Sequence, residues 1–286
     1  MTRILVVSVI AVALSACAQR PPIALQPNQS PAVAAGEKLE HLHELVRQIV
    51  TADYVGDRQM LDRLYSEADG FLGDKVIESR VRFWKGFAKW RRAMNGANEA
   101  ITPTDLADDV EIAADQMRRS GEIDPEFVDA RIGEMQCLGL MLFFDHKRVG
   151  GERIARLRAL MNDLEKTAAD KPRYVWAWGM AYFTVPPEKG GGPVRVINAY
   201  LGALDKVRNG VRVVKTPLDP SWGEAELCVN LAYSYLNQPM PDLTMARKYV
   251  DEAINLVPNW HYARDILRPQ IEAAAKKMAE AGEPGR

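Results

Sequence analysis

The 286-residue sequence predicts an all-α protein, and three observations predict it. From residue 36 onward, apolar residues recur at the spacing of an amphipathic helix. Glycine- and proline-rich turn signals separate these segments at lengths typical of helical hairpins. The longest run with the alternation of a β-strand is short, at residues 211–214. Because 47% of the residues are hydrophobic, the chain can bury a sizeable core, which excludes wholesale disorder.

The first 16 residues are predicted to be a cleaved signal peptide. Arg3 precedes an apolar run over residues 4–14, which is shorter than the roughly 20 residues that a membrane-spanning helix needs. Leu14-Ser15-Ala16-Cys17 resembles the lipobox of bacterial lipoproteins. The resemblance implies that Cys17 is lipidated and becomes the mature N-terminus. The alternative is an ordinary signal peptide that happens to precede a cysteine.

The residues after Cys17 predict where the protein is held. Residue 18 is Ala rather than Asp, which in lipoprotein sorting favours the outer membrane of a Gram-negative bacterium. The resemblance thus implies a protein that faces the periplasm and contacts the membrane through its lipid anchor. Several acyl chains on one residue anchor stably, whereas one chain alone is marginal. Residues 17–35 contain four prolines and predict an extended tether.

The body of the chain predicts a series of helical hairpins. Residues 36–73 form the first, whose helices end near Gly56 and near Gly70. Residues 74–258 then divide into four further hairpins of similar length. Residues 259–282 predict a capping helix with one face toward solvent, and residues 283–286 are a short tail.

Residues 222–258 carry the clearest repeat signature. Leu231, Ala232 and Tyr235 mark a first helix, and Ala246, Val250, Ala253 and Pro258 mark a second. This spacing closely resembles that of a tetratricopeptide repeat (TPR). In that pattern alanines let the two helices approach closely, a bulky residue fills the gap, and proline ends the second helix.

The same signature recurs upstream with decreasing clarity. Trp178, Gly179 and Tyr182 repeat the first-helix pattern, and Tyr200 and Ala203 repeat the second. The hairpins before residue 172 keep only the second-helix spacing, so two repeats are good matches and two are degenerate. The resemblance implies structural repeat positions at Trp178, Gly179, Tyr182, Tyr200, Ala203, Leu231, Ala232, Tyr235, Ala246, Ala253 and Pro258.

No pattern of catalytic or metal-binding residues emerges from the sequence. His41 and His43 point to different helix faces, and the other two histidines are isolated. In the loop 188–193 the lysine precedes the glycines, which is the wrong order for a phosphate-binding Walker loop. Cys137 and Cys228 are expected to be buried small hydrophobes. We therefore expect no enzyme, no metal site and no cofactor.

The remaining candidates for recognition are tryptophans. With 37 basic and 38 acidic residues, the chain lacks the positive excess that nucleic-acid binding requires. Trp176 precedes the repeat position Trp178 by two residues, so it either packs on a neighbouring repeat or lines the concave groove of the repeat stack. Trp84 and Trp90 lie among lysines and arginines and are candidates for a partner surface or for a packed helix.

These observations predict a non-enzymatic, lipid-anchored periplasmic protein that binds a protein or peptide partner, or serves as its scaffold. The alternative is a small-molecule module. In its predicted architecture the chain resembles the T-component of tripartite (TRAP) transporters, an accessory lipoprotein with degenerate TPRs. An open polar groove would favour a peptide partner, whereas a closed apolar cavity would favour the transport alternative.

Overall fold

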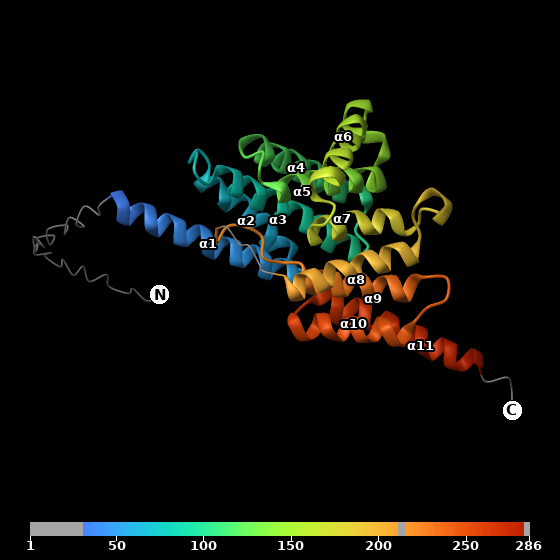
Figure 1. Cartoon of the computed structure of the whole chain (residues 1–286). Helices are drawn as coiled ribbons and strands as arrows, with labels where there is room; N and C mark the ends of the chain where they lie inside the picture. Colours follow the sequence, from blue (N-terminus) through green and yellow to red (C-terminus); the bar gives the residue numbers. More distant parts are fainter. Residues whose placement is uncertain (1–30, 211–215, 283–286) are drawn as a thin grey trace, which may run out of the picture. The chain divides into compact units, whose positions relative to one another are not determined.

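The computed structural model describes residues 31–210 and 216–282. The signal peptide, Cys17, the tether up to residue 30 and the tail 283–286 lie outside the described residues. The chain divides into residues 1–38 and a compact unit of residues 39–286. Residues 31–38 are helical. Throughout the described residues the secondary structure is helical, which confirms the predicted all-α class (Figure 1).

The described residues form a series of α-helices. In chain order the α-helices are α1 (Pro31–Val55), α2 (Arg58–Glu67), α3 (Glu78–Asn98), α4 (Pro103–Ile123), α5 (Val128–Phe144), α6 (Gly151–Ala168), α7 (Pro172–Phe183), α8 (Pro193–Asn209), α9 (Glu224–Asn237), α10 (Leu243–Leu256) and α11 (Arg268–Gly282). Short 3₁₀ turns are η1 (Ala68–Phe71), η2 (His146–Arg148) and η3 (Pro187–Lys189), and η4 (Tyr262–Leu267) is a π-helical turn before α11.

Local signals in the sequence account for most helix ends. Pro172 and Pro193 each occupy the first turn of a helix, where a missing N–H costs nothing. The Asp57 carboxylate accepts a hydrogen bond from the backbone N–H of Met60 and caps α2. The predicted tether boundary at residue 35 is wrong: α1 begins at Pro31, because proline is tolerated in a first helical turn and the alanines that follow favour helix.

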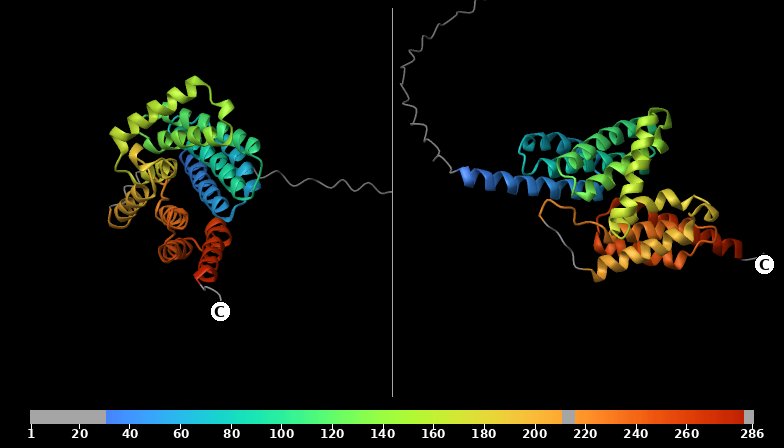
Figure 2. Two further views of the ribbon diagram at one scale, coloured as in Figure 1. Left: turned by 90° about the vertical axis from the view of Figure 1, so that its right-hand side faces the viewer. Right: turned by 45° about the horizontal axis from the view of Figure 1, so that its top comes forward.

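Most helices that are adjacent in sequence pack against each other. The pairs α3/α4, α5/α6, α7/α8 and α9/α10 correspond to the four hairpins expected between residues 74 and 258 (Figure 2). Contacts of α4 with α5 and of α8 with α9 join neighbouring hairpins, and α11 packs on α10. The predicted capping segment is therefore the π-helical turn followed by α11.

The buried side chains form two hydrophobic clusters. The first contains residues from α1 to α7, and the second contains residues from α7 to α11. Trp176 and Trp178, both on α7, contact both clusters. The end of α1 also reaches the second cluster, where Tyr54 meets Trp260 with a 5.1 Å separation of ring centroids. Helix α7 and the end of α1 thus join the two halves of the core.

Most of the expected repeat positions lie in the second cluster. A Cβ atom at Gly179 would lie 2.4 Å from the ring of Tyr200, so α7 and α8 approach closely at this glycine. Trp178, Tyr182 and Tyr235 are half-buried, and Pro258 is exposed just beyond the end of α10. The fully or almost fully buried positions are Tyr200, Ala203, Leu231, Ala232, Ala246 and Ala253.

Candidate functional site

Two of the tryptophans that were candidates for a partner surface lie in the core. Trp84 and Trp90 are each 2% exposed, so a partner cannot reach them. The indole N–H of Trp84 donates a hydrogen bond to the Leu218 carbonyl, 2.8 Å away. The expectation that these residues line a partner groove is corrected, because both rings pack against other aromatic side chains of α3 and its neighbours.

Trp176 packs on neighbouring elements. Its ring lies 5.7 Å from that of Trp90 on α3 and 5.1 Å from that of Trp222, which precedes α9. These contacts fit the packing alternative for Trp176, with the side chain bridging two elements outside its own hairpin. Its indole N–H is buried without an acceptor among the described residues.

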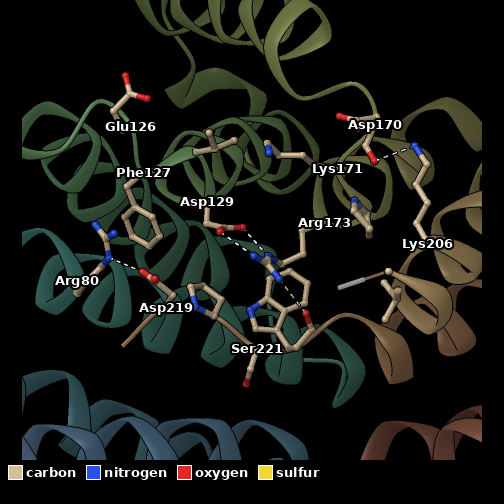
Figure 3. Close-up of a pocket in the computed structure, with 16 residues that line it drawn as sticks. Arg80, Glu126, Phe127, Asp129, Asp170, Lys171, Arg173, Lys206, Asp219 and Ser221 are labelled. Atoms are coloured by element: carbon tan, nitrogen blue, oxygen red, sulfur yellow. Dashed lines mark hydrogen bonds and ion pairs between the residues drawn. The ribbon is translucent and has the colours of Figure 1, made fainter. Parts of the chain in front are cut away.

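The strongest candidate site is a cavity of about 600 Å³ between the starts of α5 and α7, the end of α8 and the segment before α9 (Figure 3). The lining residues combine charged groups with an apolar wall. They are Arg80, Glu126, Phe127, Val128, Asp129, Asp170, Lys171, Pro172, Arg173, Lys206, Val207, Gly210, Asp219, Pro220, Ser221 and Trp222.

The segment 216–223 forms one wall of the cavity and is held in place from several sides. A turn at its start is closed by the Thr216 N–H, which donates to the Asp219 carboxylate at 2.8 Å. The hydrogen bond from Trp84 to Leu218 fixes its middle. The backbone N–H of Gly223 donates to the buried Glu226 carboxylate at 2.8 Å, which fixes its end. Two of these contacts are local, between residues three apart, and the bond from Trp84 ties the segment to α3.

Arg80 contributes structure to the cavity rather than free charge. Its Nε donates to Asp219 at 2.7 Å and its Nη1 donates to Asp124 at 2.6 Å. Its guanidinium also lies 3.7 Å from the centre of the Phe127 ring. These contacts tie α3, the start of α5 and the segment 216–223 together, and they neutralise the arginine.

Arg173, at the start of α7, is neutralised in the same way. Its Nε and Nη2 donate to the two oxygens of Asp129 at 2.5 and 2.8 Å, and its Nη1 donates to the Trp222 carbonyl at 3.2 Å. Burial opposes the charged form of Arg173, but the hydrogen bonds and charge of Asp129 outweigh it and raise the pKa of the guanidinium. This bidentate pair is therefore a fixed part of the cavity.

The charges that remain unpaired are segregated across the cavity. Lys171 has no carboxylate partner among the described residues, and the ammonium of Lys206 donates only to the Asp170 backbone carbonyl at 3.2 Å. Both lysines lie on the α7/α8 side of the cavity. Together with the Asp170 carboxylate on the same side, they give a net charge of +1. Glu126, also without a charged partner in the described part of the chain, lies across the cavity (Figure 3).

This arrangement suits non-covalent recognition. The two lysine ammonium groups can attract an anionic group, and the Glu126 carboxylate can attract a cationic one. The lining also includes the half-buried ring of Trp222, which offers apolar surface for a side chain.

A second cavity, of about 440 Å³, lies between α4, α5 and α6. Its central carboxylate, Glu134, is 2% exposed and accepts hydrogen bonds from Nε and Nη2 of Arg156, both at 2.7 Å. The other arginines that line it, Arg118 and Arg153, are also paired with acidic residues. Because these charges are already paired, this cavity is the weaker candidate.

Sequence reasoning named none of the residues that carry the unpaired charge in the first cavity. In the sequence, Lys171 and Lys206 look like ordinary solvent-facing lysines. Within residues 31–210 and 216–282, no group of three or more histidine, cysteine or acidic side chains is placed to hold a metal ion. In the same ranges, none of the helices combines the length and hydrophobicity that crossing a bilayer requires.

Cys137 and Cys228 are buried and free, as expected from the sequence.

Comparison of the chain with protein-family models, with curated proteins and with solved structures finds no match.

Proposed function

We propose that this chain is a lipid-anchored periplasmic protein that binds a protein or peptide partner at the cavity between α5, α7 and α8. The observation that carries the proposal is the segregation of unpaired charge, with Lys171 and Lys206 on one side and Glu126 on the other. The lining of the cavity also includes the apolar ring of Trp222. A peptide segment offers acidic, apolar and basic groups in sequence, and charge complementarity of this kind selects partners and their orientation.

We further propose that the hairpins form a TPR-like solenoid. The close approach of Gly179 to Tyr200 supports this within one hairpin. Between hairpins, the Asn230 amide donates to the Tyr200 hydroxyl at 3.1 Å. Ala246 and Ala253 are fully buried, as the repeat pattern requires of positions where two helices meet. A solenoid is an architecture that commonly presents surfaces to partner proteins.

A small-molecule ligand is the second candidate, and the size of the cavity favours it. A volume of about 600 Å³ lies within the range of roughly 300–1,000 Å³ typical of small-molecule sites. This would fit an accessory lipoprotein of the TRAP-transporter type. The many charged residues of the lining favour the peptide partner instead, because the transport alternative calls for an apolar cavity.

The proposed location rests on the lipobox-like residues 14–17. Lipidation at Cys17 would anchor the protein at the outer membrane and restrict its partners to those that reach the periplasmic face of that membrane. The experiments below therefore use the native host for capture of a partner.

Site-specific photo-crosslinking tests the proposal. Ser221 is exposed and lines the cavity, so a photoreactive benzoylphenylalanine in its place should capture a polypeptide partner in the native host. Replacing Lys171 and Lys206 together by Gln should reduce the yield severalfold, because each exposed ion pair contributes about 0.2–1 kcal/mol. The matched control replaces Lys166 and Lys277, which are exposed and lie outside the cavity.

Equal crosslinking yields from both double variants would contradict the proposal. Native mass spectrometry of the purified protein separates the two candidates. A bound species of small-molecule mass that is lost in the variant lacking Lys171 and Lys206 would support the transport alternative.

A further inference from the structure

The hairpin of α7 and α8 presents an arginine on two aromatic rings at the end opposite the cavity. We propose that this arginine, Arg195, binds a carboxylate group of a partner protein, so that the chain has a second recognition surface beyond the cavity. Trp178, Tyr182 and Arg195 are called the Arg195 platform below.

The two rings hold the guanidinium of Arg195 in a defined place. Its Cζ lies 5.3 Å from the ring centre of Trp178 and 5.1 Å from that of Tyr182. The rings themselves meet edge to face, with centroids 5.2 Å apart and an interplanar angle of 83°. Cation–π attraction restricts the side chain, and Arg195 itself is exposed to solvent. Less side-chain entropy is then lost when a ligand binds.

Arg195 differs from the other arginines that stack on aromatic rings. In the described part of the chain, the arginines that stack on aromatic rings are Arg80, Arg91, Arg173 and Arg195. Each of the first three also pairs with a carboxylate at 2.8 Å or less. Arg195 has no acidic partner among the described residues. Its N–H donors are therefore available to a carboxylate from outside, in the bidentate geometry that arginine favours.

The three glycines before α8 place Arg195 beside α7. The N–H of Gly192 donates to the Tyr182 carbonyl at 2.9 Å, and a Cβ at Gly191 would lie 2.7 Å from the same oxygen. Gly190 has a φ of +81°, a conformation that glycine adopts at little cost, and a Cβ at this position would lie 3.4 Å from Nη1 of Arg195. The loop 190–192 therefore folds tightly onto the end of α7, which brings Arg195 over the rings.

The surroundings of the platform indicate the kind of partner that fits. Val194, next to Arg195 in sequence, is 71% exposed and offers an apolar contact. The turn before the loop carries one acidic and one basic residue, Glu188 and Lys189, and neither pairs with Arg195. Tryptophan, tyrosine and arginine are the residues that most often dominate binding energy at protein interfaces. The matching partner segment has an Asp or Glu side chain adjacent to an apolar residue.

A peptide selection tests this proposal. Random heptapeptides displayed on phage are selected on the immobilised full-length protein, and individual peptides are then measured by fluorescence anisotropy. We expect enrichment of peptides with an acidic residue next to an apolar one. Such peptides should bind Arg195→Gln at least tenfold more weakly than the unmodified protein. Arg195→Lys should not restore binding, because lysine lacks the planar fork.

The matched control is Arg158→Gln. Arg158 is also exposed and has no acidic partner in the described residues, but it does not stack on a ring. Absence of acidic enrichment, or equal weakening by Arg195→Gln and Arg158→Gln, would overturn the proposal. Peptides that lose binding only when Lys171 and Lys206 are replaced report the cavity. A selection that yields only those peptides would refute the Arg195 platform and leave the proposed function standing.

Discussion

The close approach of Gly179 to Tyr200 makes Gly179→Ala a sharp test of the packing between α7 and α8. An ideal Cβ at Gly179 would lie 2.4 Å from the Tyr200 Cζ and Oη atoms, whereas ordinary contacts begin at 3.4 Å. The ring would have to move by about 1 Å. Tyr200 is fully buried, and its hydroxyl accepts a hydrogen bond from Asn230 that this movement would strain.

The expected loss can be worked out from these contacts. Overpacking a well-filled core costs about 1–3 kcal/mol, and weakening a hydrogen bond adds up to about 1 kcal/mol. Alanine offsets about 0.5–1 kcal/mol of this, because glycine is unfavourable within a helix. The free energy of unfolding of Gly179→Ala, measured by urea denaturation of the purified protein, should therefore fall by about 1–3 kcal/mol.

Gly202→Ala is the matched control on α8. A Cβ at Gly202 would have no atom within 4 Å, so this change should stabilise the protein by about 0.5–1 kcal/mol. The double variant Gly179→Ala with Tyr200→Leu also removes the ring. Its loss in the free energy of unfolding should be smaller than the sum of the losses of the two single variants. If Gly179→Ala and Gly202→Ala are equally stable, the close approach of the two helices is refuted.

Four further predictions follow from the sequence and the packing. Cys17→Ser should abolish membrane fractionation and the mature lipidated mass, because serine cannot form the thioether; an unchanged mass by mass spectrometry would refute the anchor. Ala253→Leu should lower the free energy of unfolding by about 1–3 kcal/mol, while the exposed Lys248→Gln should change it by under about 0.5 kcal/mol, and equal urea melts would contradict the repeat packing. Trp176→Ala should lower the free energy of unfolding by about 3–5 kcal/mol in the same assay. An unchanged melt combined with weaker partner capture would show instead that Trp176 lines the partner groove. Burial raises the pKa of Glu226 above 4.5, so the folded state holds its proton more tightly than the unfolded state does. The free energy of unfolding of Glu226→Gln should therefore rise relative to that of the unmodified protein as the pH rises above that value. Parallel stability curves between pH 4 and pH 7 would contradict this.

The candidate site could not have been located from the sequence. The cavity assembles residues from five stretches that are far apart in the chain, from Arg80 to Trp222. Which lysines remain unpaired depends on where every carboxylate lies, as the contrast between Lys171 and the buried Lys89, paired with Asp62 and Asp109, illustrates. The sequence does not show which acidic residue, if any, pairs with a given lysine.

The sequence by itself determined the helices, because helical periodicity and the turn preferences of glycine and proline act over a few residues. Periodicity also indicated that Trp176 faces away from its own hairpin. Only the tertiary structure decided what each tryptophan meets there. The indole of Trp84 bonds to a carbonyl 134 residues later in the chain, and Trp176 lies between Trp90 and Trp222. Burial is a property of the neighbours that folding supplies, so an aromatic residue on a basic helix looks the same in sequence whether it is exposed or buried.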